Sequence, residues 1–113
     1  MNDDLEGALK AYLKLMDEEE YFEAHEVLEE AWHPLRIKDH PLKNLVKGLI
    51  NGAVSFEHLK RNGQDADRKA LRVMESYEKH KGIYINEIEF ADLFKEACEK
   101  IETLKLSHPE VWQ

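Results

Sequence analysis

Apolar residues recur every three or four positions through most of this chain, a spacing that matches the 3.6 residues of an α-helical turn. The clearest case is the segment 41–62, where apolar or small side chains form one stripe along a single helix face. Only five Gly and three Pro occur among the 113 residues, so little interrupts these patterns. The stripe consists of Leu42, Leu45, Leu49, Gly52, Phe56 and Leu59. Long helices are therefore favoured over short strands.

Five segments with this periodicity predict an all-α fold, in the form of a single antiparallel helical bundle of about five helices. The connections between the segments are short and contain no linker-like composition, so residues 1–113 are expected to form one domain. The expected helices span residues 3–16, about 18–33, 41–62, 65–80 and about 87–105.

Turn-forming residues indicate where these helices end. Pro34 has no N–H to donate and disfavours helical geometry in the residue before it, so the second helix is expected to end or kink there. Asn62, followed by Gly63, is expected to end the third helix in the left-handed conformation. The tail 107–113 is predicted to be extended, with Trp112 docked on the helices.

Two capping patterns and one short apolar segment complete the expected fold. Asp3 followed by Glu6, and Asn86 followed by Glu89, have the spacing of capping boxes at helix starts. The segment 83–85 is too short for an independent strand and is expected to cover one end of the bundle.

Charge limits the classes of partner that suit this chain. Its formal net charge of −8 argues against nucleic acid and anionic membranes, which both need a basic face. No run of about 18 apolar residues exists that could span a bilayer. Cys98 is the only cysteine, which suits a reducing cytoplasm, and the N-terminus lacks a signal-peptide pattern. We therefore expect a cytoplasmic protein, with one basic cluster around Arg68 that could meet an acidic partner.

The segment from Tyr21 to Trp32 holds the residues best suited to chemistry. Drawn as a helix, it has a broad apolar arc and an acidic arc, and His25 and Glu29 lie between the two. One turn apart, they could offer a divalent metal ion an imidazole nitrogen and a carboxylate oxygen. Two ligands do not hold a metal ion, and His58 on the third expected helix is the best candidate for another.

An uncharged polar stripe on the third expected helix supports this placement. In so charged a protein, a solvent-facing stripe would normally carry Lys and Glu. The lack of charged side chains on this stripe indicates that it is partly buried against another helix or a cavity. Asn51 could add a carbonyl oxygen, while Trp32, Phe22 and Ser55 would complete the pocket. The stripe comprises Asn44, Asn51, Ser55, His58 and Asn62.

Familiar catalytic patterns are not met. The run from His25 to Glu29 lacks the second histidine of His-Glu-x-x-His zinc sites. Only Glu30 and His33 have the Glu-x-x-His spacing of di-iron helical proteins, and they fall on the acidic arc. If a metal ion kept an open coordination position, hydrolysis would be the natural chemistry. Whether the chain is an enzyme stays open.

A non-enzymatic interpretation stands beside the metal or ligand site. A half-buried histidine that donates to a glutamate can fix helix packing without any ligand. The chain would then be an interaction module. Gly48, Gly52 and Ser55 at helical spacing would let a second copy approach the third helix closely and form a homodimer.

Two blocks of the sequence resemble a small prokaryotic family called domain of unknown function 309. The family motif His-x-x-x-Glu-x-x-Trp/Tyr is met by His25, Glu29 and Trp32. The later segment 48–61 is similar to the family's second block, and the resemblance covers roughly residues 12–75. It implies an all-helical fold and a motif suspected of binding metal, and it implies no established reaction.

The chain departs from the family pattern at three places. Asn51 occupies a position where the family has Gln, and its shorter side chain could weaken a polar contact in the expected site. Asn62 and Gly63 reverse the usual Gly-Asn order, and Glu19 replaces a small turn residue. The last two departures are expected to reshape turns only.

Overall fold

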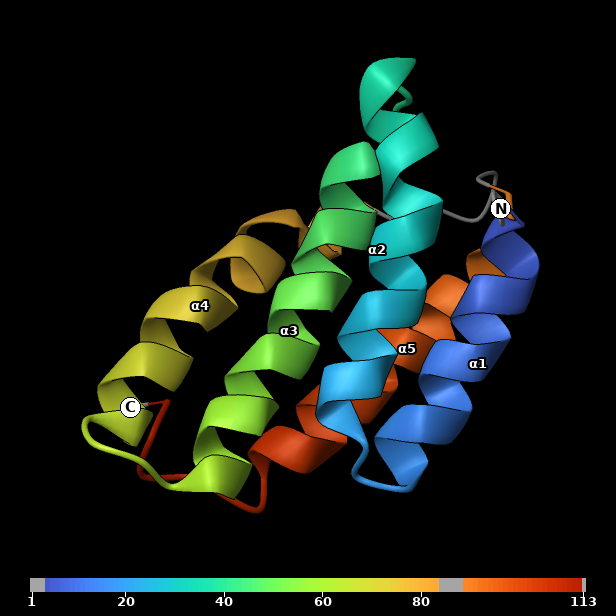
Figure 1. Cartoon of the computed structure of the whole chain (residues 1–113). Helices are drawn as coiled ribbons and strands as arrows, with labels where there is room; N and C mark the ends of the chain where they lie inside the picture. Colours follow the sequence, from blue (N-terminus) through green and yellow to red (C-terminus); the bar gives the residue numbers. More distant parts are fainter. Residues whose placement is uncertain (1–3, 84–88, 113) are drawn as a thin grey trace.

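The computed structural model describes residues 4–83 and 89–112, which form five α-helices and no strand (Figure 1). The all-α prediction is confirmed. The elements are α1 (Leu5–Asp17), α2 (Tyr21–Ile37), α3 (Lys43–Arg61), α4 (Ala66–His80), the 3-10 turn η1 (Lys81–Ile83) and α5 (Ala91–Lys105).

Helices α1 to α4 lie side by side in chain order, and α5 returns behind them to pack on α1 (Figure 1). Helix α3 is the central element, since it contacts α2, α4 and α5. Its apolar stripe is buried as expected, and Leu45 and Leu49 are fully enclosed. The buried Tyr12 hydroxyl of α1 donates a hydrogen bond of 2.8 Å to the Leu49 carbonyl oxygen. Apolar burial and a few satisfied polar groups thus hold the core together.

The small residues of α3 make their close contacts within the chain. A Cβ atom built on Gly48 would lie 3.0 Å from the Tyr77 Cα of α4. The fully buried Ser55 hydroxyl donates a hydrogen bond of 2.7 Å to the Ala70 carbonyl oxygen, also on α4. A Cβ atom built on Gly52 would lie 2.7 Å from the end of the Ile101 side chain of α5. The face that we expected a second copy to use is therefore covered by α4 and α5.

Of the two predicted outcomes at Pro34, an end or a kink, the end is wrong, because helix α2 continues to Ile37. Proline removes one helical hydrogen bond, whereas Leu35 in the last turn is buried and holds that turn on the core. After the helix, Asp39 takes a positive φ of 54° and turns the chain away. The His40 N–H then closes the turn on the Leu35 carbonyl oxygen at 2.9 Å.

Helix α1 ends in a similar left-handed turn, centred on Glu19 with a φ of 60°. The Glu20 N–H donates to the Leu15 carbonyl oxygen at 2.8 Å, and the Glu19 N–H donates to that of Met16 at 3.1 Å. This hydrogen-bond pattern is a Schellman motif, in which Gly is the usual residue at the left-handed position. The position where the family has a small residue is therefore one that demands a positive φ.

The other helix boundaries agree only partly with those predicted from the sequence. Asp4 caps α1, since its side chain accepts a hydrogen bond of 3.1 Å from the Gly7 N–H, and the predicted Asp3 cap lies outside the described residues. Asn62 ends α3 with a φ of 52°, as predicted. Helix α5 begins at Ala91 rather than near residue 87. The Asn86 cap and most of the expected lid at 83–85 also lie outside the described residues.

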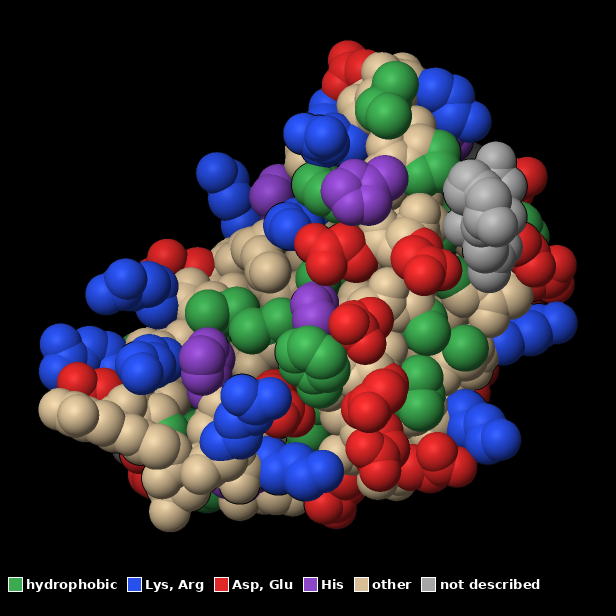
Figure 2. Space-filling model, in the orientation of Figure 1, with side chains coloured by type: hydrophobic (Ala, Val, Ile, Leu, Met, Phe, Trp, Pro, Cys, Tyr) green, Lys and Arg blue, Asp and Glu red, His purple; other side chains and the backbone are tan. Residues whose placement is uncertain are grey.

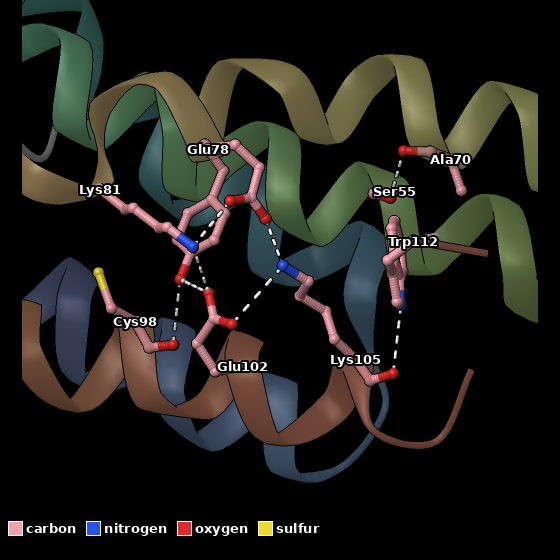
Figure 3. Close-up of polar contacts among 9 residues, drawn as sticks. Ser55, Ala70, Glu78, Lys81, Cys98, Glu102, Lys105 and Trp112 are labelled. Atoms are coloured by element: carbon pink, nitrogen blue, oxygen red, sulfur yellow. Dashed lines mark hydrogen bonds and ion pairs between the residues drawn. The ribbon is translucent and has the colours of Figure 1, made fainter. Parts of the chain in front are cut away.

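The C-terminal segment folds back in turns and is not extended, which corrects the prediction for residues 107–112. Its expected docking is confirmed, since the Trp112 ring lies 6.0 Å from the Phe56 ring, edge to face. The Trp112 indole also donates a hydrogen bond of 3.2 Å to the Lys105 carbonyl oxygen (Figure 3). The hydrogen bond and the ring contact explain why a short polar tail returns to the helices.

A cluster of charged side chains joins α4 and η1 to α5 (Figure 3). The Tyr77 hydroxyl donates to a Glu102 carboxylate oxygen at 2.6 Å, and Lys81 lies 2.7 Å from Glu78 and 3.2 Å from Glu102. Lys105 pairs with both glutamates. Burial opposes ionisation of Glu102, but hydrogen bonds from Tyr77 and Lys81 outweigh it and lower its pKa. The cluster therefore favours two ionised carboxylates between α4 and α5.

Candidate functional site

His25 of α2 is held by its own helix. Its Nδ1 atom lies 2.7 Å from the Phe22 carbonyl oxygen, and its Nε2 atom lies 3.5 Å from a Glu29 carboxylate oxygen. A carbonyl oxygen only accepts hydrogen bonds, so Nδ1 must carry a proton. Nε2 then either carries a second proton and pairs with Glu29, or directs a lone pair toward a carboxylate. In the second state two acceptors face each other, and a bound cation or a bridging water molecule would relieve their repulsion.

The predicted His25–Glu29 contact is thus present, and it lies at the edge of the helix packing. The His25 side chain is 18% exposed and that of Glu29 is 39% exposed. Both polar partners of His25 within the described residues belong to α2. The pair therefore links no second helix through a hydrogen bond or an ion pair, which its expected structural role would require.

A hollow of about 190 Å³ lies between α2 and α3, and His25 and His58 both line it. Two histidines from separate sequence blocks thus lie on one surface. We call this hollow the α2/α3 groove. Its lining residues are Phe22, His25, Val54, Glu57, His58 and Arg61.

Glu57 also lines this groove, although it is not among the site residues expected from the sequence. Its side chain is only 17% exposed, and the Arg61 Nε atom lies 2.5 Å from its carboxylate. The Arg61 guanidinium in turn lies 5.8 Å from the centre of the Phe22 ring. Four groove residues of α3 follow the i, i+3, i+4, i+7 spacing of one helix face, namely Val54, Glu57, His58 and Arg61. That spacing was the signal that could have identified Glu57.

Glu29 does not line the α2/α3 groove. It lines a separate hollow on the outer face of α2, among other acidic side chains. His25 therefore stands between the two hollows, with Glu29 on one side and His58 on the other. Within residues 4–83 and 89–112, no three His, Cys, Asp or Glu side chains are arranged to hold a metal ion. The expected set of His25, Glu29 and His58 is thus not assembled as a three-ligand site.

The other predicted pocket residues lie elsewhere, apart from Phe22. Ser55 is buried on the α4 side of α3. The Trp32 indole donates a hydrogen bond of 3.1 Å to the Lys43 carbonyl oxygen, with the Lys47 amine 4.3 Å from its ring centre. Asn51 is half-buried but does not line the groove. Two helical turns separate Trp32 from His25, about 10 Å along the axis, which a helical wheel does not display.

A second hollow of about 240 Å³ lies between α3 and α4 and shares His58 with the groove. Basic side chains dominate it. Figure 2 shows that acidic side chains gather over α2 and that basic ones prevail over α4. We call this hollow the basic pocket. It is lined by His58, Asp65, Arg68, Lys69, Arg72 and Val73.

A third hollow, of about 600 Å³, lies between α4 and α5 beside Cys98. Burial raises the pKa of the Cys98 thiol to about 11, so little thiolate exists at neutral pH. The nearby Tyr77, Lys81 and Glu102 side chains bond to one another in the cluster described above. This hollow therefore contains no reactive cysteine, and the polar side chains of the cluster are already engaged with one another and do not invite a ligand.

Comparisons with known proteins place the groove residues inside a family domain. Residues 9–70 match the family described as Domain of unknown function (DUF309), which is more than half of the chain. Neither the curated proteins nor the solved structures contain a match to this sequence. No helix within the described residues is long and apolar enough to cross a membrane.

Proposed function

We propose that this protein, which belongs to the family described as Domain of unknown function (DUF309), binds a small ligand in the α2/α3 groove. The observation that carries the proposal is that His25 and His58, from two separate blocks of the family domain, line one hollow. Phe22 and Val54 supply apolar wall, and small-molecule sites typically combine apolar walls with a few polar groups.

The groove suits a small ligand or the end of a larger one. Its volume of about 190 Å³ is below the range of about 300–1,000 Å³ that is typical of drug-sized ligands. His25 would meet the ligand through Nε2, because Nδ1 is engaged with the Phe22 carbonyl oxygen. Arg61 would supply guanidinium N–H groups that Glu57 does not use, which favours a ligand with an anionic group.

Benzoate is a suitable probe, because it combines one flat apolar ring with one carboxylate. We expect millimolar benzoate to shift the side-chain NMR signals of His25 and His58 but not that of His33, which lies outside the groove. His25→Ala should weaken this binding about tenfold, whereas the exposed Glu26→Gln on the same helix should leave it unchanged. Unaltered His25 and His58 signals at saturating benzoate, or equal binding by both variants, would rule the groove out as a ligand site.

A divalent metal ion at His25 and Glu29 is a second candidate, and the geometry of His25 favours it. Metal-bound histidines commonly donate their other ring N–H to a backbone carbonyl, as Nδ1 does here. Two donors at about 2.1 Å from a tetrahedral ion lie about 3.4 Å apart. The Nε2–Oε1 distance of 3.5 Å is close to this value.

This site offers two protein ligands, so any ion would take its remaining ligands from water or from a groove ligand. A bound divalent ion would supply the Lewis acidity that hydrolytic reactions use. The test is metal analysis of protein purified without a histidine tag, followed by Zn²⁺ and Mn²⁺ titration. His25→Ala and Glu29→Gln should abolish binding, and Glu26→Gln should not. Absence of micromolar binding, or equal binding in all variants, would exclude the ion.

The non-enzymatic alternative gives a different result in the same variants. If His25 and Glu29 only stabilise α2, His25→Ala lowers the melting temperature by the same amount with and without a chelator. A homodimer would have to use a surface other than the Gly48–Ser55 face, and sedimentation would detect it. A cytoplasmic location remains our inference, supported by the single, partly buried cysteine Cys98.

A further inference from the structure

The basic pocket carries a local positive charge in an acidic protein. Three cations, Arg68, Lys69 and Arg72, line it with one carboxylate, that of Asp65, so its formal charge is +2. The whole chain has a net charge of −8. Asp65 is already engaged, since its Oδ1 atom lies 3.2 Å from an Arg68 guanidinium nitrogen. Among the described residues that line the pocket, no second carboxylate balances the remaining positive charge.

Two of these cations and the shared histidine have unused donors. In the part of the chain that the structure describes, Lys69 and Arg72 form no ion pair and no side-chain hydrogen bond. The His58 ring likewise has no polar partner there. His58 lines both the α2/α3 groove and the basic pocket, so a ligand lying in both hollows would contact it.

We infer that the ligand of the α2/α3 groove carries a phosphomonoester group, and that this group binds in the basic pocket beside His58. The inference rests on the proposed function. A phosphomonoester has three terminal oxygens and nearly two negative charges, and it can accept from His58, Lys69 and Arg72 at once. A carboxylate has two oxygens and one charge, so it would leave part of this donor set unused.

The surrounding charge favours a small phosphate ester over a nucleic acid. The neighbouring face of α2 bears Glu23, Glu26 and Glu30, which line the hollow on the far side of His25. An extended polyphosphate backbone crossing the groove would meet these carboxylates and be repelled. A single phosphate in the basic pocket, with the rest of the ligand over Phe22, would avoid them.

Three probes separate the two hollows. Benzoate should use the groove alone, inorganic phosphate the basic pocket alone, and phenyl phosphate both. We expect phenyl phosphate to bind at least tenfold more tightly than either of the others, measured by calorimetry and by NMR shifts of His58. Phenyl phosphate that binds no better than inorganic phosphate would overturn the idea of one ligand in both hollows.

Two charge-removing variants of α4 measure the contribution of the basic pocket to phosphate binding. Arg72→Gln should weaken phosphate and phenyl phosphate binding about tenfold and leave benzoate binding unchanged. Lys79→Gln removes the same charge from another exposed site of α4 and is the matched control. Equal losses in Arg72→Gln and Lys79→Gln would mean general electrostatic attraction and would refute the pocket. Because Arg72 and Lys79 are both exposed, neither change should affect folding.

Failure of this inference can be told apart from failure of the proposed function. If benzoate shifts the NMR signals of His25 and His58 but inorganic phosphate and phenyl phosphate do not bind in the basic pocket, the groove remains a ligand site. The inference that its ligand carries a phosphomonoester would then be wrong. If a phosphoserine peptide binds more tightly than phenyl phosphate and is unaffected by His25→Ala, the phosphate belongs to a protein partner. That result would overturn the small-molecule ligand.

Discussion

Gly48 packs directly against the backbone of Tyr77, so that α3 and α4 meet without an intervening side chain. A Cβ atom on Gly48 would lie 3.0 Å from the Tyr77 Cα and 3.3 Å from the Ser76 carbonyl oxygen. Both neighbours are backbone atoms, which cannot turn aside as a flexible side chain can. The glycine therefore sets how closely the central helix and α4 approach.

Gly48→Ala should lower the free energy of unfolding by about 1 kcal/mol. Overpacking a well-packed core costs about 1–3 kcal/mol, and the better helix propensity of Ala returns about 1 kcal/mol. Urea unfolding measures the difference. Gly63→Ala is the control, because nothing lies within 4 Å of a Cβ atom there. A Gly48→Ala protein as stable as the Gly63→Ala protein would show that α4 moves away freely.

Glu19→Gly should raise the melting temperature. A left-handed residue other than Gly costs about 1–2 kcal/mol, and the greater freedom of Gly in the unfolded chain offsets part of the gain. The hydrogen bond of 2.7 Å from Lys60 Nζ to the Glu19 carbonyl oxygen uses the backbone and can persist. Glu18→Gly, at a φ of −87°, should be destabilising instead. Equal effects of the two changes would contradict the role of the positive φ.

Glu102→Gln should make stability less dependent on acid pH. Hydrogen bonds from Tyr77 and Lys81 outweigh partial burial and hold the pKa of Glu102 below its usual value of 4.5. A carboxyl whose folded pKa is lowered stabilises the protein above about pH 4.5, and this contribution is lost as pH falls through the folded pKa. The variant should therefore be less stable at pH 7, with a difference that shrinks toward pH 3.

Glu96→Gln, which removes an exposed carboxylate of the same helix outside the cluster, is the control for this series. Urea unfolding at pH 7, 5, 4 and 3 gives the comparison. A Glu102→Gln difference that stayed constant from pH 7 to pH 3 would show that the ionised carboxylate adds nothing to the Tyr77–Lys81 cluster.

His25 should carry a proton on Nδ1 in every ionisation state of the folded protein. The Phe22 carbonyl oxygen at 2.7 Å can only accept, so loss of the Nδ1 proton would leave two acceptors in contact. Long-range proton–nitrogen NMR spectra distinguish Nδ1 from Nε2 and should show that the proton of the neutral ring is on Nδ1. The ring of His58, which has no polar partner among the described residues, is the comparison. An Nε2-protonated neutral form of His25 would contradict the geometry.

Much of the candidate site could be predicted from spacing within one helix. The contact between His25 and Glu29 follows from their separation by four residues, since such side chains meet on one face of a helix. The left-handed end at Asn62 follows from its residue type in the same local way. These features need no knowledge of the neighbouring helices.

Predictions about which residues share a pocket succeeded less well, because a helical wheel gives direction but not height. Trp32 lies two turns from His25, beside which it was placed, and Asn51, expected on the face of His58 two turns earlier, does not line the groove. Ser55 points to α4 rather than to α2, because α3 has packed neighbours on three sides. Glu57 was left out, although its spacing puts it on the same face of α3 as Val54 and Arg61.

The sequence by itself therefore determined the helical class, most of the helix limits and the meeting of His25 with Glu29, since each depends on residues within about one turn of each other. Only the tertiary structure decided that His58 and Glu57 share the α2/α3 groove with His25 while Glu29 faces away. The relative height and rotation of two helices are set by how their side chains interlock and by where their connecting turns end. These quantities are properties of pairs of helices, and no single segment encodes them.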